Sequence, residues 1–216
     1  MKSQKRGHMS RETRWWWIRH APVTENSKKM CGHSDLPPDF RGAEKSVSEL
    51  ASILPLAGTA IVSDLIRAVA TAEALHKAGA TWSDEHREPD FREQNFGDWE
   101  GLPYEKISAF QKEEPQHKGW LAPAFVRPPN GESYLDVVGR VVPAIIRHTS
   151  ISAGKDIIAV AHAGSIRAAI SYALGLDPET SLSFSLENLS LTRLDHIETN
   201  GDGGIWRIIC INRIFG

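Results

Sequence analysis

The chain has 216 residues, 41% of them hydrophobic and 24% charged, which is enough for one domain with a sizeable buried core. A net charge of −2 gives no reason to expect nucleic acid or an anionic membrane as a partner, and no apolar run approaches the ~20 residues of a membrane-spanning helix. The two cysteines form neither a disulfide framework nor a metal-binding pattern, which suits the reducing cytoplasm.

The chain divides into a short leader and one domain. Residues 1–13 open with a basic segment that lacks an apolar stretch of signal-peptide length, so we expect a disordered leader. Residues 14–216 contain no internal repeat and no low-complexity segment, and we expect them to form a single domain.

The first half of this domain alternates apolar runs with helical patterns. The run Trp15-Trp16-Trp17-Ile18 predicts a buried central strand, which must stop near Pro22 because proline lacks an N–H group. We expect Ser63 and Asp64 to cap the helix that follows the second strand. In chain order, the pattern predicts a strand at 15–18, a long loop at 23–41, a helix at 42–54, a strand at 59–63 and a helix at 67–77.

The second half is irregular in its middle and ends in strands. Glu132 and Ser133 are expected to start a long helix, and residues 200–204 to form a hairpin turn. Alternation of strands and helices favours an α/β fold with parallel pairing and crossover helices. The elements predicted here are a strand at 87–91, helices at 104–114, 134–149 and 166–174, a strand at 156–161, and strands at 183–186, 189–196 and 205–211.

Charged and polar side chains follow three of the predicted strands. Arg19 and His20 end the first strand, Arg67 follows the second, and His162 ends the strand at 156–161. If these strands are parallel neighbours, their carboxyl ends meet at one edge of the sheet, where open α/β sheets build their sites. Helix N-termini after Asp64 and near residues 164–165 add free N–H groups. The pattern predicts a pocket for a dianionic phosphoryl group, with guanidinium groups matched to its oxygens.

The same segments resemble the signatures of the histidine phosphatase superfamily, also called the phosphoglycerate mutase-like family. The matching segments are Arg19-His20 with Asn26, residues 31–37, residues 63–68 with 71–73, residues 91–101, residues 130–133 and residues 160–167. They occur in the family's order and cover most of the chain. The resemblance implies a three-layer α/β/α sandwich, in which a mainly parallel sheet carries an antiparallel edge strand.

The resemblance also implies a role for each of the main residues. His20 is expected to attack phosphorus and form a phosphohistidine, with Glu93 as the general acid and then the general base. Arg19, Arg67 and His162 are expected to hold the phosphoryl oxygens, and Asn26 and Ala163 to complete the phosphate site. No metal and no cofactor is implied, and the expected partner is a small phosphate ester. A homodimer is compatible with the resemblance, since family members are often dimers.

The sequence departs from the family pattern at two places. Ala21-Pro22-Val23 replaces Gly-Glu-Thr, and Ala163 replaces a glycine, which affects the fit of the substrate more than phosphoryl chemistry. Residues 94–97 read Gln-Asn-Phe-Gly where the family's mutases have Arg-His-Tyr-Gly, and the mutases' arginine pair has no counterpart between Asp98 and Pro128.

These features favour a phosphomonoesterase. The alternatives are a cofactor-dependent phosphoglycerate mutase and a non-catalytic phosphate-binding scaffold; the intact set of His20, Glu93 and arginines argues against the scaffold. Among phosphatases, the short middle segment looks most like that of α-ribazole phosphatases. Fructose-bisphosphatase-like and broad-specificity bacterial members are close rivals.

Overall fold

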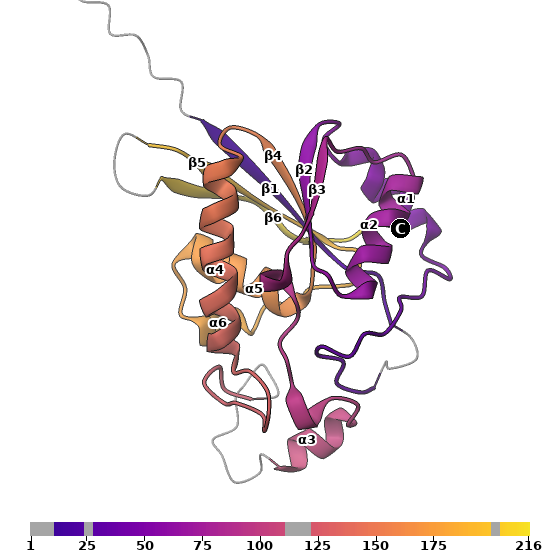
Figure 1. Ribbon diagram of the computed structural model, residues 1–216, viewed down its shortest axis with the longest axis vertical. Coiled ribbons are helices and arrows are strands. Elements are labelled where there is room, and N and C mark those ends of the chain that lie inside the picture. The colour runs from indigo at the N-terminus through magenta and orange to yellow at the C-terminus, as the bar shows by residue number, and fades with distance from the viewer. Residues whose placement is uncertain (1–10, 24–27, 111–121, 200–203) are drawn as a thin grey trace, which may run out of the picture.

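A computed structural model describes residues 11–23, 28–110, 122–199 and 204–216 (Figure 1). Residues 1–10 of the predicted leader, Asn26, the end of the predicted helix at 104–114 and most of the predicted turn at 200–204 lie outside these ranges. The first strand begins at Glu12, within residues 1–13, which were predicted to be the leader.

One six-stranded sheet forms the centre of the molecule, with the strand order β3-β2-β4-β1-β5-β6. Strands β3, β2, β4 and β1 are parallel neighbours, whereas β5 is antiparallel to β1 and to β6. The predicted fold class is confirmed, and the antiparallel pairing is confined to one side of the sheet. The strands are β1 (Glu12–Arg19), β2 (Gly58–Val62), β3 (Asp84–Arg87), β4 (Asp156–Ala161), β5 (Leu191–Ile197) and β6 (Ile205–Arg213).

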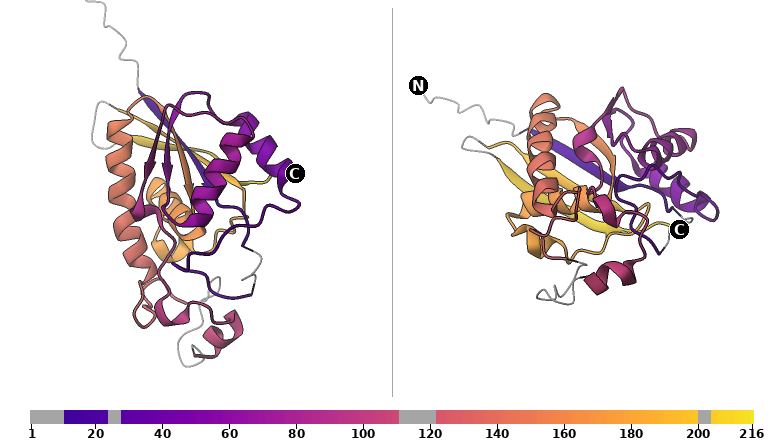
Figure 2. Two further views of the ribbon diagram at one scale, coloured as in Figure 1. Left: turned by 45° about the vertical axis from the view of Figure 1, so that its right-hand side comes forward. Right: turned by 60° about the horizontal axis from the view of Figure 1, so that its bottom comes forward.

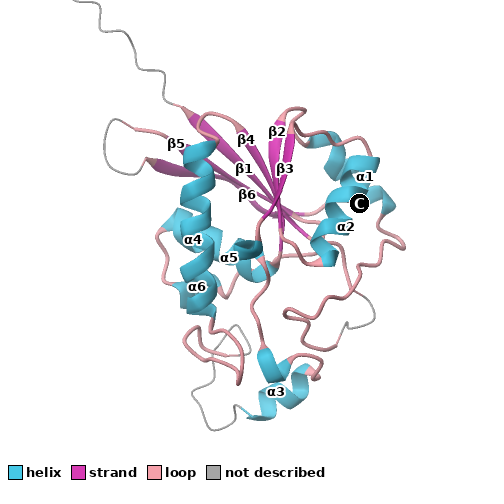
Figure 3. Ribbon diagram, in the orientation of Figure 1, coloured by secondary structure: helices cyan, strands magenta, loops and turns pink. Residues whose placement is uncertain are grey.

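Helices cover both faces of this sheet (Figures 1 and 2). Helices α1 and α2 lie on one face, and α4, α5 and α6 lie on the other, while α3 lies beyond the carboxyl ends of the parallel strands (Figure 3). The helices are α1 (Glu44–Ile53), α2 (Ile66–Lys77), α3 (Tyr104–Phe110), α4 (Tyr134–Ile151), α5 (Ala163–Leu174) and α6 (Pro178–Ser181). None of the helices in the described ranges has the length and apolar character needed to cross a membrane.

The tryptophan run of β1 supplies both layers of the core. Trp15 and Trp17 are buried in the cluster beneath α4 and α5, and their rings stack with centroids 5.0 Å apart. Ile18 is buried in the cluster beneath α1 and α2, and Trp16 packs on the edge of that cluster. Because successive side chains of a strand point to opposite faces, one short apolar run anchors the helices on both sides.

Two predicted strands are wrong. The strand at 87–91 is instead the end of β3 followed by a 3-10 helix over Pro89–Phe91, since Pro89 has no N–H to donate to a neighbouring strand. Residues 183–186 form turns and loop, in which the N–H groups of Ser183 and Phe184 bond to the preceding residues. The carbonyl oxygens of Phe184 and Leu186 accept hydrogen bonds from Arg167 and Arg19 instead of from a neighbouring strand.

Helix boundaries differ from the predictions by small amounts, with one informative exception. Helix α5 begins at Ala163, about one turn earlier than predicted, directly after the strand end that carries His162. Helix α4 begins as predicted, because the Ser133 side chain and the Asp136 side chain form a capping box. The early start of α5 brings its first N–H groups into the site described next.

Candidate active site

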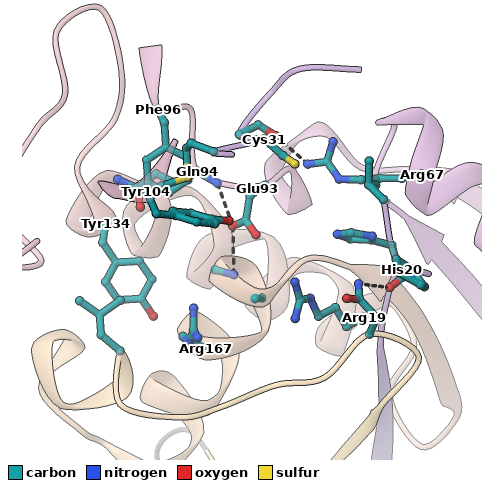
Figure 4. Close-up of a pocket in the computed structure, with 18 residues that line it drawn as sticks. Arg19, His20, Cys31, Arg67, Glu93, Gln94, Phe96, Tyr104, Tyr134 and Arg167 are labelled. Atoms are coloured by element: carbon teal, nitrogen blue, oxygen red, sulfur yellow. Dashed lines mark hydrogen bonds between the residues drawn. The ribbon is translucent and has the colours of Figure 1, made fainter. Parts of the chain in front are cut away.

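The candidate site lies at the edge of the sheet where β1, β2 and β4 end. Arg19 pairs with Ala161, and Val62 pairs with Val160, so the residues that follow these strands are neighbours in space. A cavity of about 560 Å³ opens at this edge (Figure 4). The predicted site residues on its wall are Arg19, His20, Arg67, Glu93 and Ala163.

His20 follows β1 and is almost fully buried. Its Nδ1 lies 2.7 Å from the carbonyl oxygen of Ala21, and because a carbonyl only accepts, Nδ1 carries the proton and Nε2 carries the lone pair. Burial, with Arg67 and Arg19 nearby, lowers the pKa of His20 well below its ordinary value. The ring is therefore neutral at pH 7 and presents an unprotonated Nε2, which is the form that a nucleophile requires.

Two arginines flank this imidazole. Arg67 is 1% exposed, and its guanidinium donates to the carbonyl oxygens of Ser34 at 2.9 Å and Gly32 at 2.6 Å. Arg19 donates to the carbonyl oxygen of Leu186, and its Nε is buried without a partner among the described residues. Burial lowers the pKa of both guanidinium groups. Because each one has five N–H donors, donors remain for the oxygens of a bound anion.

His162 follows β4, and both nitrogens of its ring lie against protein groups. Its Nδ1 accepts from Nε of Arg67 at 3.3 Å, so its Nε2 carries the proton and donates to the Ser63 hydroxyl at 2.8 Å. The His20 and His162 rings lie 4.9 Å apart, and burial, with Arg67 beside it, lowers the pKa of His162. Both ring nitrogens bind protein groups, so here His162 orients Arg67. Its direct contact with phosphate stays a prediction.

Glu93 reaches the cavity from the loop after the 3-10 helix. Its Oε1 accepts from the backbone N–H groups of Gln94 and Gly164, each at 3.0 Å. A Cβ on Gly164 would lie 2.3 Å from that oxygen, so only glycine allows this approach. The first turn of α5, which was predicted to face phosphate, therefore holds the carboxylate of Glu93. Oε2 remains to exchange a proton with a substrate.

Arg140 of α4 holds the backbone of this acid-bearing loop, a role the sequence analysis missed. Its guanidinium donates to the carbonyl oxygens of Asp90 at 2.6 Å, Arg92 at 3.0 Å and Glu93 at 2.9 Å. It also binds the Glu132 carboxylate through two hydrogen bonds of 2.9 Å. Although burial opposes it, this pairing holds the pKa of Glu132 below its ordinary value. A single arginine in a helical pattern carries no signal of such a role.

Glu100 fixes the loop that orients Arg67. Its Oε1 accepts from the backbone N–H of His33 at 2.7 Å, and its Oε2 accepts from the Ser34 hydroxyl at 2.9 Å. Gly32 has a φ of +51°, and a Cβ there would lie 2.1 Å from Glu100 Oε1. The loop therefore needs glycine at this position, and its carbonyl groups face the guanidinium of Arg67.

The cap predicted for α2 is wrong. Asp35, from the loop at 23–41, accepts the backbone N–H of Ile66 at 2.7 Å. Asp64 instead forms an ion pair with Arg92, and the hydrogen bond from this arginine lowers the pKa of Asp64. The Ser63 hydroxyl accepts a hydrogen bond from Nε2 of His162, as described above. The chain places a better acceptor at the helix start from a distant segment, which local sequence cannot reveal.

The cavity wall also contains residues that were not predicted to act in the site, among them Tyr104, Tyr134, Arg167 and Asn188. Arg167 is the one with a sequence signal, because it ends the matching segment at 160–167. Asn188 donates to the backbone carbonyl of His20 at 2.8 Å. Asn188 lies 168 residues from His20 along the chain, so no local pattern in the sequence indicates this contact.

The departures from the family pattern lie on the cavity wall or just behind it. The backbone N–H of Ala21 donates to the Thr71 hydroxyl at 2.9 Å, which fixes the chain directly after His20. Pro22 and Val23 line the cavity and add apolar surface to it. The described residues contain no group of three or more His, Cys, Asp and Glu side chains placed to hold a metal ion.

A family model for the histidine phosphatase superfamily (branch 1) matches residues 15–209 of the chain. A 2,3-bisphosphoglycerate-dependent phosphoglycerate mutase of Beijerinckia indica is 39% identical over 105 residues, which cover 47% of this chain. The match spans about half (49%) of that curated relative's length.

Solved structures agree with the family match. A mycobacterial glucosyl-3-phosphoglycerate phosphatase is 27% identical, with a TM-score of 0.75 over 94% of this chain and 100% of that one. A putative alpha-ribazole-5′-P phosphatase from Escherichia coli has a TM-score of 0.73 over 94% of this chain and 98% of that one. At 22% identity, the second similarity shows the fold alone.

Proposed function

Because the chain belongs to the histidine phosphatase superfamily, we propose that it is a metal-independent phosphomonoesterase that forms a phosphohistidine on His20. The observation that carries the proposal is the hydrogen bond from Nδ1 of His20 to the Ala21 carbonyl. It leaves the lone pair on Nε2, in a buried site between two arginines, with a carboxylic acid candidate in the same cavity.

In the first step, Nε2 of His20 attacks phosphorus and the bond from phosphorus to the ester oxygen breaks. Arg19 and Arg67 stabilise the charge on the phosphoryl oxygens. Glu93 enters this step protonated and gives its proton from Oε2 to the leaving alkoxide, so the alcohol departs neutral. The products are the alcohol and a phosphohistidine, with Glu93 as a carboxylate.

In the second step, the Glu93 carboxylate takes a proton from water while the water oxygen attacks phosphorus. The bond from phosphorus to Nε2 breaks, inorganic phosphate forms, and His20 regains its lone pair. The proton on Nδ1 stays in place throughout because the Ala21 carbonyl holds it. Glu93 ends protonated and ready for another ester.

Relatives and neighbours suggest which small esters deserve testing. Phosphoglycerate mutases, a glucosyl-3-phosphoglycerate phosphatase and a putative alpha-ribazole phosphatase are similar to this chain. The cavity of about 560 Å³ has the size of a metabolite site. We therefore propose a small phosphorylated metabolite as substrate, with sugar phosphates, phosphoglycerates and α-ribazole phosphate as the panel to screen.

Phosphoglycerate mutase activity is the second candidate, and the similarity to the Beijerinckia enzyme favours it. A mutase returns the phosphoryl group to a bound intermediate, whereas a phosphatase transfers it to water. Incubation with 3-phosphoglycerate and catalytic 2,3-bisphosphoglycerate separates the two activities, because a mutase forms 2-phosphoglycerate without releasing stoichiometric phosphate.

The test of the proposal is turnover of p-nitrophenyl phosphate in EDTA by the wild-type protein and by His20→Ala. We expect EDTA-resistant phosphate release that falls at least about a thousandfold in the variant, since the nucleophile is removed. Acid-labile, alkali-stable label from a ³²P-ester should be trapped on the wild-type protein only. Activity retained by a folded His20→Ala protein would contradict the proposal.

The matched control is His86→Ala. His86 lies on the exposed edge strand β3 and pairs with Asp84 at 2.9 Å. The control removes an imidazole of the same kind without touching the cavity, so turnover should stay within about twofold of wild type.

A further inference from the structure

Arg167 is a third buried arginine on the cavity wall, and the proposed reaction does not use it. It lies on the second turn of α5 and is 7% exposed. Its Nε donates to the carbonyl oxygen of Phe184 at 2.9 Å, which sets the orientation of the guanidinium plane. The loop at 183–186, wrongly predicted to be a strand, thus serves to orient this side chain.

Arg167 lies on the leaving-group side of the cavity. Figure 4 shows it near Tyr134, across the cavity from His20 and Arg67, with Glu93 and Arg19 between them. The proton donated by Glu93 goes to the ester oxygen, so whatever lies beyond Glu93 from His20 faces the alcohol part of the substrate. Arg167 is therefore placed to meet that part and not the phosphoryl group.

The tyrosine beside Arg167 does not supply a donor for an anion. The Ser181 hydroxyl donates to the carbonyl oxygen of Pro178 at 2.7 Å, so at 2.8 Å it must accept from the Tyr134 hydroxyl. The Tyr134 oxygen consequently presents lone pairs at this end of the cavity, where Arg167 is the charged donor. Burial lowers the pKa of Arg167, and the nearby Glu93 partly offsets this effect, so an anion bound here would stabilise the guanidinium.

We infer that Arg167 forms a second anion subsite, so that the preferred substrate is a phosphate monoester whose alcohol part carries a carboxylate or another oxyanion. This inference rests on the proposed function and adds the substrate class. The phosphoryl dianion is matched by Arg19 and Arg67, and a planar guanidinium fork beyond Glu93 matches one further oxyanion.

A pair of nearly isosteric esters tests the subsite. D-3-Phosphoglycerate and glycerol phosphate differ by a carboxylate in place of a hydroxymethyl group. We expect wild-type kcat/KM to be at least about tenfold higher for the acidic ester, because charge-assisted hydrogen bonds to a buried arginine are strong. In Arg167→Met this preference should shrink to within about threefold, and Arg167→Lys, which keeps the charge without the fork, should retain part of it.

Arg207→Met is the matched control. Arg207 lies on β6 at the opposite end of the molecule from the cavity and pairs with Glu12 and Asp195. The Arg207→Met substitution removes the same charge and adds the same side chain as Arg167→Met. The preference for the acidic ester should therefore stay at the wild-type value. Thermal melts establish that each variant is folded; if Arg167→Met does not fold, the Arg167→Lys ratio decides.

Binding to His20→Ala measures the subsite without turnover. We would measure the dissociation constants of the two esters by calorimetry for His20→Ala and for the double variant His20→Ala/Arg167→Met. The double variant should show the same loss of preference for the acidic ester. If the wild-type protein does not turn over p-nitrophenyl phosphate but His20→Ala still binds the acidic ester more tightly, the proposed phosphatase activity is contradicted and the subsite is supported.

A wild-type protein that binds and turns over both esters equally, or a folded Arg167→Met protein that keeps the preference, would overturn the inference. In that case Arg167 only supports the loop at 183–186. Propane-1,3-diol bisphosphate distinguishes the anions: a gain equal to that of the carboxylate supports a general oxyanion subsite, and no gain supports a carboxylate subsite.

Discussion

The two ends of β1 and β4 differ in how their buried charges are paired. At the start of these strands, buried carboxylates lie against arginines. At their carboxyl ends, buried arginines lie against carbonyl oxygens and a neutral imidazole. Asp156 accepts from Arg14 at 2.6 Å and from the Trp16 indole at 2.9 Å. Asp195, which is fully buried, accepts from Arg193 at 3.0 Å and from Arg207 at 3.2 Å. Charge at this end is balanced within the protein.

The carboxyl ends of the same strands carry a positive excess. Arg67 is bonded to the Gly32 and Ser34 carbonyls and to His162, and Arg19 to the Leu186 carbonyl. Dipoles compensate a buried charge only in part, so this end of the sheet is prepared for an anion. The balanced end should therefore govern stability, and the unbalanced end should govern catalysis and respond to phosphate.

The largest loss of activity is expected from removing Arg67. In Arg67→Met we expect kcat/KM to fall about a thousandfold or more, because the variant lacks a guanidinium that stabilises the phosphoryl oxygens in the transition state. Inorganic phosphate at about 100 times its Kd should stabilise the wild type by ~2.7 kcal/mol, and this gain should disappear in the variant. Steady-state kinetics and melting curves with and without phosphate measure both effects; a phosphate-dependent shift retained in the variant would refute the assignment.

Glu93→Gln should separate the two chemical steps. We expect kcat to fall about a hundredfold or more, since both proton transfers lose their group. With p-nitrophenyl phosphate, whose leaving group needs little protonation, the second step should become the slower one. Stopped-flow traces should then show a burst of p-nitrophenol equal to the protein concentration. A uniform slowing without a burst would mean that Glu93 does not activate water.

Arg193→Met should act on the balanced end alone. The guanidinium carbon of Arg193 lies 4.3 Å from the centre of the Trp16 ring, and Arg193 also pairs with the buried Asp195. Its removal should lower the free energy of unfolding by about 2 kcal/mol. For a chain of this size, that lowers Tm by about 6 °C. Calorimetry checks the stability, and kcat/KM should stay within about twofold of wild type. A large loss of activity would show that the two ends are coupled.

Arg140→Met should show the effect of a residue that positions Glu93 without touching the substrate. We expect kcat to fall about tenfold with little change in KM, because the loop that carries Glu93 loses its hydrogen bonds to Arg140. In a Glu93→Gln background the same substitution should have almost no further effect. Additive losses in the double variant would place the action of Arg140 elsewhere.

The smallest effect concerns protonation of His20. Its pKa is lowered by burial and by the arginines, so the ring should stay neutral as the pH falls through the ordinary value of ~6.5. The folded protein then binds fewer protons than the unfolded chain, and the free energy of unfolding should decrease as the pH drops below ~6.5. NMR of the ring nitrogens and melts of His20→Gln, which should show a shallower pH dependence, test this. A His20 that titrates at or above 6.5 would contradict it.

Much of the fold followed from short-range pattern. The Trp15–Ile18 run, the apolar run at 156–161 and the helical spacing of α2 and α4 predicted the correct elements, because burial on both faces or along one stripe imposes a visible periodicity. The strands predicted at 87–91 and 183–186 do not form, although both segments have β-propensity. Pro89 places a 3-10 helix in the first segment, and the Phe184 carbonyl in the second binds Arg167 instead of a strand. Those residues are held by contacts with distant parts of the chain.

The fold class, the family resemblance and the site positions could all be predicted from the sequence. The site residues His20, Arg19, Arg67 and Glu93 each lie at a recognisable strand end or in a recognisable motif. The contacts of these residues could be read from the folded chain alone. They include the Nδ1 hydrogen bond of His20, the hold of α5 on Glu93, the bond between His162 and Arg67, and the places of Arg140 and Arg167 at the site. These features depend on hydrogen bonds between residues many positions apart, and the direction of such a bond is set by packing and leaves no local pattern in the chain.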